Sequence, residues 1–161
     1  MNINVKKYIL LLMCAFLSIG LFGCNYKINK NMFSKNKPNN YHYTSLLMKD
    51  LSREKPKEIY ALYMNFYKEK DFSDEDLSTF SDFFNSLKND NFIEKPADLP
   101  EKPLYKIFVS FNENKYIINL YNENFISIYP FDGDYKMDYI DTSKMYKAYN
   151  LYGLCKYLIP N

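Results

Sequence analysis

The stretch that decides the fold is Leu104–Ile140, which reads LYKIFVSFNENKYIINLYNENFISIYPFDGDYKMDYI. Over 104–111 the side chains alternate between two faces, and this is the period of a β-strand with one buried side. Apolar runs of strand length follow at 115–121, 125–129 and 135–140. The sequence therefore predicts a meander of four antiparallel strands.

Each gap between these strands carries residues that favour turns. Asn112-Glu113-Asn114 and Asn122-Glu123-Asn124 supply Asn, which accepts the positive φ that many turns need. Pro130 ends the third strand because it has no N–H to donate. Asp132-Gly133 is the strongest hairpin dipeptide in the chain and leads into the fourth strand.

The clearest helix is predicted over 73–89. Ser73 is the candidate N-cap, and Asp76, three residues on, completes a capping box. An apolar stripe follows at helical spacing; it consists of Leu77, Phe80, Phe83, Phe84 and Leu87. A second helical region is predicted over 143–158, where Gly153 weakens the helix. Three residues can cap it: Asp141, Thr142 and Ser143.

Two earlier segments complete the fold. Residues 43–52 are predicted to form a short helix, interrupted by Pro56. Residues 59–67 match helical spacing but are short and rich in Tyr, so a strand is favoured and a helix is the alternative. The predicted class is α+β, with a mostly antiparallel sheet of four to five strands and a meander at about 104–140. The helices at about 73–89 and 143–158 are expected to pack on one face.

The N-terminus has the pattern of an exported protein. Lys6-Lys7 precedes an uncharged run at 8–22, which is shorter than the roughly 20 residues of a membrane-spanning helix. The run ends in Leu21-Phe22-Gly23-Cys24, which looks like the lipobox of bacterial lipoproteins. The resemblance implies that 1–23 is a signal peptide and that Cys24 becomes an N-terminus carrying two acyl chains such as palmitate, which anchor stably. The alternative is a short uncleaved anchor.

Residues 24–42 are interpreted as a flexible polar tether, and 43–161 as a single globular α+β domain. The tether is rich in Asn and Lys and poor in apolar residues. Its lysines could also rest on anionic lipid headgroups. Cys155 is then the last free thiol, so the mature domain has no internal disulfide. We expect Cys155 to pack as a small hydrophobic residue.

Charge argues against a nucleic-acid partner. Lys and Arg sum to 21 and Asp and Glu to 19; loss of Lys6 and Lys7 with the signal peptide leaves 21 − 2 = 19 basic side chains against 19 acidic ones. A neutral chain lacks the basic footprint of a nucleic-acid binder. Because 47% of the residues are hydrophobic and 19% aromatic, disorder over the whole length is also excluded.

The sequence shows no catalytic or metal-binding constellation. His42 is the single His, so a zinc site or a Ser-His-Asp or Cys-His nucleophile is not expected. Only Gly133 and Gly153 follow the signal peptide, which excludes Gly-rich phosphate loops. Four carboxylates cluster but miss the spacing of an EF-hand: Asp132, Asp134, Asp138 and Asp141. We therefore expect no metal, no cofactor and no enzymatic activity.

Aromatic residues are the remaining functional candidates. Four of them fall on or near the last hairpin: Tyr129, Phe131, Tyr135 and Tyr139. Exposed aromatic side chains anchor protein partners or stack on sugar rings, because they bring a large area at a low cost in conformational entropy. The alternative is that they fill strand positions and line the core.

The lipobox, the length and three short runs resemble a family of small uncharacterised clostridial lipoproteins; the runs are Ile128–Gly133, Asp138–Asp141 and Asn150–Tyr152. The resemblance implies no activity and no site residues. We expect a lipid-anchored module on the extracytoplasmic face of the cell membrane that binds an envelope protein or assists a membrane assembly. The alternative is capture of a small molecule or cell-wall glycan in a Tyr-lined cleft. A hydrolase with an unrecognised dyad is a third hypothesis.

Overall fold

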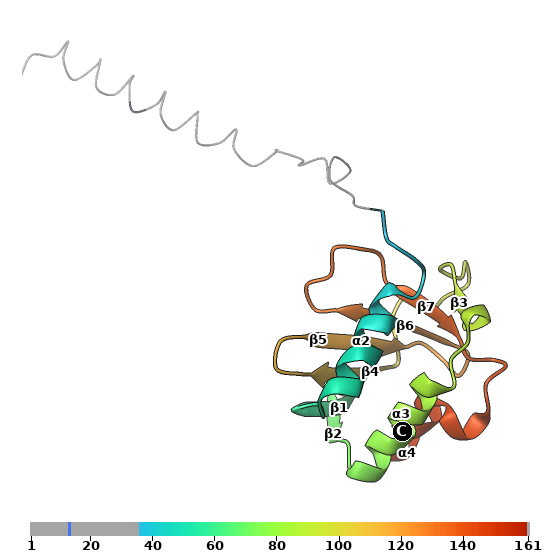
Figure 1. Ribbon diagram of the computed structural model, residues 1–161. Helices are drawn as coiled ribbons and strands as arrows, with labels where there is room; N and C mark the ends of the chain where they lie inside the picture. Colours follow the sequence, from blue (N-terminus) through green and yellow to red (C-terminus); the bar gives the residue numbers. More distant parts are fainter. Residues whose placement is uncertain (1–12, 14–35, 161) are drawn as a thin grey trace, which may run out of the picture. The chain divides into compact units, whose positions relative to one another are not determined.

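Seven strands form one sheet in the order β2-β1-β4-β5-β6-β7-β3, and every neighbouring pair is antiparallel (Figure 1). The computed structural model describes Met13 and residues 36–160. The segment interpreted as a signal peptide (1–23), apart from Met13, and the predicted lipidation site Cys24 lie outside the described residues. The α+β class is confirmed, but the expected number of four to five strands is wrong.

The strands are short, as is usual in antiparallel sheets. Their bounds are β1 Glu58–Tyr63, β2 Lys68–Asp71, β3 Phe92–Ile93, β4 Tyr105–Ser110, β5 Lys115–Leu120, β6 Phe125–Pro130 and β7 Asp138–Asp141. The four strands of the predicted meander are present as β4 to β7, and β7 begins three residues later than expected. The favoured strand at 59–67 is confirmed for β1; the rest of that segment is the turn into β2.

The two unpredicted strands lie at the edges of the sheet. β2 reads Lys-Glu-Lys-Asp and all four residues are exposed, so it has no hydrophobic pattern to reveal it. Charged residues on an edge strand discourage pairing with other chains. β3 has only two residues and is defined by its pairing with β7.

The first face of the sheet carries the core. Ala61, Ile107, Ile118 and Ile128 are paired in register across four strands, and all are fully buried. Three helices lie over this face (Figure 1): α2 His42–Arg53, α3 Asp74–Asn85 and α4 Leu151–Leu158. All the α-helices that residues 36–160 form lie on this one side, and this is a common way to bury one face of an antiparallel sheet.

The helix α3 confirms the predicted N-terminus but ends early. Ser73 and Asp76 form the capping box, with the Asp76 N–H donating to the Ser73 side chain and the Ser73 N–H donating to the Asp76 carboxylate. The predicted end at 89 is wrong: α3 stops at Asn85, Ser86 is its C-cap, and a 3-10 turn, η3 Asn89–Asn91, follows.

The predicted start of the last helix, at 143, is also wrong. Thr142 continues the sheet, because its N–H donates to the Asn124 carbonyl and its hydroxyl to the Glu123 carbonyl. A 3-10 turn, η4 Lys147–Tyr149, precedes α4, and Asn150 caps α4 by accepting from the Gly153 N–H. Gly153 therefore lies in the first turn of this helix.

The predicted turns form, but by a different mechanism. Among residues 36–160, Tyr67 is the one non-glycine residue with a positive φ, at 52°. The Asn residues of the turns therefore do not use the left-handed region. Asn122 instead accepts from the N–H groups of Asn124 and Phe125 through its side chain. Gly133 has no positive φ either. A Cβ at position 133 would lie 2.7 Å from the Tyr43 hydroxyl, so glycine is needed there because the Tyr43 side chain packs closely on the backbone.

Candidate functional site

The second face of the sheet carries a row of large side chains in place of helices. Tyr60, Phe108, Ile117 and Tyr129 are paired in register from β1 to β6. The rings of Tyr60 and Phe108 stack with centroids 5.0 Å apart and an interplanar angle of 14°. Both are half-buried. We call these four residues, with Tyr139 on β7, the aromatic face.

A crossover segment covers part of this second face. β3 and β4 run parallel, because four antiparallel pairings separate them in the sheet: β3 with β7, β7 with β6, β6 with β5, and β5 with β4. Their connection, 94–104, must therefore return across the sheet, and such crossovers are right-handed. The helices occupy the first face, so this segment lies on the side away from α2 (Figure 1). The β1–β4 part of the aromatic face is left half-exposed.

Polar groups lie at the centre of the second face. The Asn119 Nδ2 donates to the Ser127 hydroxyl at 3.1 Å, and that hydroxyl donates to the Met137 sulfur at 3.4 Å. Ser127 is fully buried and Asn119 nearly so. The Asn119 Oδ1 is buried without a hydrogen-bond partner among the described residues. A buried acceptor left unpaired costs about 1–3 kcal/mol, so this point is not optimised for stability.

The four predicted binding residues do not form one patch. Tyr129 and Tyr139 lie on the second face, where burial raises the pKa of both hydroxyls. Tyr135 packs on the other side against His42, with ring centroids 5.3 Å apart. Phe131 is 74% exposed in the β6–β7 loop. The four aromatic residues of the last hairpin therefore lie in three places: on the second face, against α2 on the opposite side, and in the exposed β6–β7 loop.

Tyr60 and Phe108 are functional candidates that were not predicted from the sequence. Alternation in β1 and β4 puts each on the side opposite the buried residues, but only the register of the two strands brings the rings together. Burial, followed by the charges of Glu69 and Glu58, raises the pKa of Tyr60, so its hydroxyl is a neutral donor at physiological pH.

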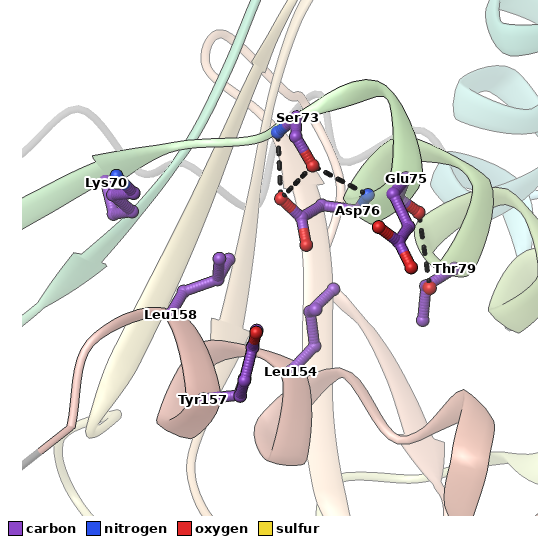
Figure 2. A pocket seen from close by; sticks show the side chains of 8 residues that line it. All are labelled: Lys70, Ser73, Glu75, Asp76, Thr79, Leu154, Tyr157 and Leu158. Atoms are coloured by element: carbon purple, nitrogen blue, oxygen red, sulfur yellow. Dashed lines mark hydrogen bonds between the residues drawn. The ribbon is translucent and has the colours of Figure 1, made fainter.

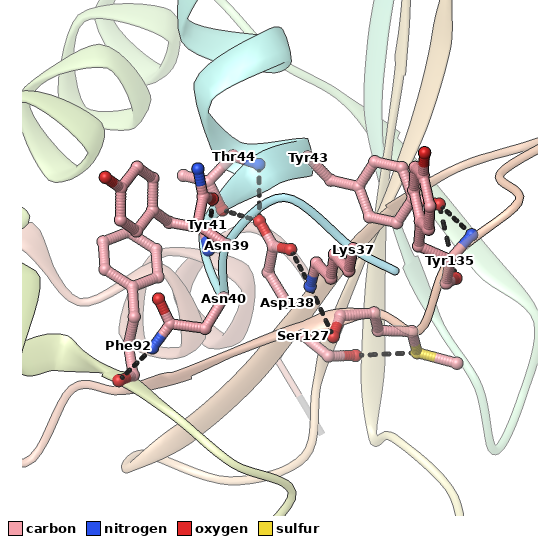
Figure 3. Close-up of polar contacts among 11 residues, drawn as sticks. Lys37, Asn39, Asn40, Tyr41, Tyr43, Thr44, Phe92, Ser127, Tyr135 and Asp138 are labelled. Atoms are coloured by element: carbon pink, nitrogen blue, oxygen red, sulfur yellow. Dashed lines mark hydrogen bonds and ion pairs between the residues drawn. The ribbon is translucent and has the colours of Figure 1, made fainter. Parts of the chain in front are cut away.

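The N-terminal side of the domain is held by a buried ion pair (Figure 3). The Lys37 ammonium lies 2.5 Å from the carboxylate of Asp138, which is fully buried. Asn40 donates to the Phe92 carbonyl, and the Tyr41 ring packs on the Phe92 ring. Lys37, Asn40 and Tyr41 therefore contact the domain although they lie within the segment interpreted as tether (24–42).

His42 and Cys155 do not form a pair. His42 is the first residue of α2 and packs on the rings of Tyr43 and Tyr135. Cys155 is fully buried in the core, as expected for a small hydrophobic residue, and burial raises the pKa of its thiol. A buried neutral thiol is a poor nucleophile. In the described part of the chain, no group of three His, Cys, Asp or Glu residues could hold a metal ion, and no helix is long and apolar enough to cross a membrane.

A hollow of about 630 Å³ lies between α3 and α4 (Figure 2). It is not lined by any of the four predicted aromatics. Its tyrosine is Tyr157, and the rest of the lining is a mixture of leucines and polar side chains.

Comparison with known proteins places the chain in a family. Residues 37–155 match the family described as a domain of unknown function, DUF4883. A crystal structure of a "Putative Lipoprotein from Clostridium perfringens" is 37% identical, with a TM-score of 0.69; the match covers 76% of this chain and 97% of that chain. No curated protein is significantly similar. The family match begins at Lys37, the residue paired with Asp138, and the chain belongs to the DUF4883 family of uncharacterised clostridial lipoproteins.

Proposed function

We propose that this protein is a lipid-anchored, non-enzymatic module on the extracytoplasmic face of the cell membrane that binds an envelope protein through its aromatic face. The observation that carries the proposal is the half-exposed stack of Tyr60 on Phe108, on a face that bears no helix. Partly exposed aromatic side chains are typical anchors of protein interfaces.

The surroundings of the stack also favour a protein partner. Leu62 lies beside Tyr60 on the same face, and Lys106 is paired with Leu62 in register. Glu69 and Asp71 of β2 stand opposite Leu62 and Tyr60, so charges border the apolar centre. An apolar centre with a charged rim is the usual anatomy of a protein–protein interface.

Lipid attachment at Cys24 would set the distance over which the partner is met. From Cys24 to Lys37, which is fixed to the domain by its ion pair with Asp138, there are 37 − 24 = 13 residues. A fully extended chain of that length spans at most about 45 Å. The partner is therefore a membrane protein or another protein close to the membrane surface.

The lipid anchor is tested by metabolic labelling with a palmitate analogue. We expect wild-type protein to be labelled and Cys24→Ala to be unlabelled and released from the membrane fraction. Label that persists in Cys24→Ala would contradict the anchor, since Cys155 is buried and is a poor acceptor.

The partner site is tested by crosslinking in cells. Tagged full-length protein is crosslinked on its own membrane and its adducts are quantified by mass spectrometry. We expect one dominant protein adduct that is lost in Tyr60→Ser and kept in Tyr146→Ser, since Tyr146 is 72% exposed and lies outside the aromatic face. Equal adduct yields in the two variants would contradict the site.

A further inference from the structure

The groove between α3 and α4 has one apolar side. Leu154 and Leu158 stand one turn apart on α4 and both line the hollow (Figure 2). Tyr157 stands beside them and is 80% exposed. A tyrosine so exposed contributes little to the core, so its ring is free to pack on a ligand.

The opposite side of the groove is polar. Glu75, Asp76 and Thr79 of α3 line it, and Lys70 of β2 closes one end. One oxygen of Asp76 belongs to the capping box with Ser73, and Figure 2 shows the other oxygen on the groove side. No hydrogen bond or ion pair with the rest of the described chain occupies the Glu75 carboxylate or the Lys70 ammonium.

The apolar side and the acidic side of the groove together limit which class of ligand can bind there. A phosphorylated or polyanionic ligand would meet the carboxylates of Glu75 and Asp76, which together outweigh Lys70. A hydrocarbon would remove these carboxylates from water without offering hydrogen bonds, and burial of an unpaired charge is unfavourable. A ligand with an apolar face and several hydroxyl groups satisfies both sides of the groove. A hollow of about 630 Å³ is within the range of small-ligand sites.

We propose that the groove between α3 and α4 binds a neutral pyranose oligosaccharide. The C–H face of one sugar ring packs on the Tyr157 ring and on Leu154 and Leu158. Its hydroxyl groups donate to the carboxylates of Glu75 and Asp76 and accept from the Lys70 ammonium.

The groove is independent of the aromatic face. In β2, Lys70 is paired with Ala61 of the first face, whereas Glu69 and Asp71 are paired with residues of the second face. A protein on the aromatic face and a glycan in the groove can therefore be bound at the same time. An experiment can therefore contradict the glycan site and still identify the protein partner, or contradict the protein partner and still detect glycan binding.

Ligand-observed saturation-transfer NMR tests the site with the full-length protein in detergent micelles. The probes are cellotetraose and tetra-N-acetylchitotetraose, which are both neutral, with glucose 6-phosphate as the anionic comparison. We expect saturation transfer to at least one tetrasaccharide and none to the phosphate. Tyr157→Ala should weaken that affinity by about tenfold, which corresponds to 1.4 kcal/mol, and Glu75→Gln by several-fold.

The matched control is Tyr146→Ala, which removes an equally exposed tyrosine outside the groove. It should bind the tetrasaccharide as the wild type does. Tyr157 and Glu75 are both exposed, so neither variant is expected to unfold. The proposal is overturned if neither tetrasaccharide shows saturation transfer at concentrations of about 5 mM, several times a millimolar Kd. It is also overturned if Tyr157→Ala and Tyr146→Ala bind equally.

Discussion

Asp138 of β7 and Thr44 of α2, 94 residues apart in the chain, are joined by two hydrogen bonds. One Asp138 carboxylate oxygen accepts from the Thr44 N–H at 2.7 Å and from the Thr44 hydroxyl at 2.8 Å. The first N–H groups of a helix have no partner within the helix, and the N-cap residue Tyr41 offers α2 no side-chain acceptor. The Asp138 carboxylate accepts from one of these N–H groups instead. Its other oxygen meets Lys37. This carboxylate fixes the segment through which the domain would be tethered.

The first prediction concerns this carboxylate. Asp138→Ala leaves the Lys37 ammonium without its counter-charge and the Thr44 N–H without a partner, so we expect the free energy of unfolding to fall by about 3 kcal/mol. Urea denaturation measures it. Lys37→Met should cost less, because the two bonds to Thr44 remain. A cost for Asp138→Ala no larger than that for Lys37→Met would refute the account.

The second prediction concerns the β6–β7 loop. The Tyr43 hydroxyl accepts from the Tyr135 N–H at 2.6 Å and lies over Gly133. In Gly133→Ala the new Cβ would come within 2.7 Å of that hydroxyl and 2.9 Å of the Pro130 ring, so we expect a loss of about 1–3 kcal/mol by overpacking.

A double-mutant cycle with Tyr43→Phe identifies the cause. Removing the hydroxyl takes away the closest contact, so Gly133→Ala should cost less in the Tyr43→Phe background than in the wild type. Thermal unfolding of the four proteins provides the comparison. Strict additivity would show that the clash with Tyr43 is not the reason for glycine.

The third prediction concerns alkaline pH. Burial, and then the hydrogen bond to Asp50 and its charge, raise the pKa of Tyr116 above its ordinary value near 10. The neutral phenol is therefore favoured in the folded state. Its contribution is complete below pH 10 and is lost as the pH rises above 10, where the tyrosine of the unfolded chain ionises.

Tyr116→Phe makes this contribution measurable. At pH 7 we expect a loss of about 2 kcal/mol, the usual value of a hydrogen bond to a charged group. The difference between wild type and variant should shrink above pH 10, measured by urea denaturation at pH 7, 9 and 11. A difference that stays constant or grows with pH would contradict the assigned sign.

The fourth prediction concerns the thiols. Cys155 is fully buried and burial raises the pKa of its thiol, so it should not react with Ellman's reagent in the native protein. Cys24 carries lipid in our account. Processed protein should therefore release no thiol signal when native and one equivalent when unfolded. Rapid reaction of native protein would contradict the burial of Cys155 or the modification of Cys24.

Local patterns in the sequence predicted the elements that depend on nearby residues. The Ser73–Asp76 capping box sets the start of α3, and alternation sets β4, β5 and β6. β2 and β3 escaped detection because pairing alone makes them strands: β2 is charged throughout and β3 has two residues. The apolar stripe does not predict that α3 ends at Asn85, because the stripe continues to Leu87.

The candidate site depends on register, and this is why the sequence predicted only part of it. Tyr129 and Tyr139 were chosen because they lie near one hairpin, and they do share the second face. Tyr135 was chosen for the same reason, yet the irregular 131–137 loop turns it to the other side against Tyr43. The stack of Tyr60 on Phe108 joins segments 48 residues apart (108 − 60), and no local pattern encodes that distance.

The central claim is that a protein partner rests on the aromatic face. It is tested most directly by placing a benzophenone amino acid at position 60 or at position 146 of the full-length protein and irradiating living cells. The account predicts a discrete protein adduct from position 60 and none from position 146. Adducts of equal yield from both positions, or no adduct from position 60 while the protein is on the membrane, would contradict it.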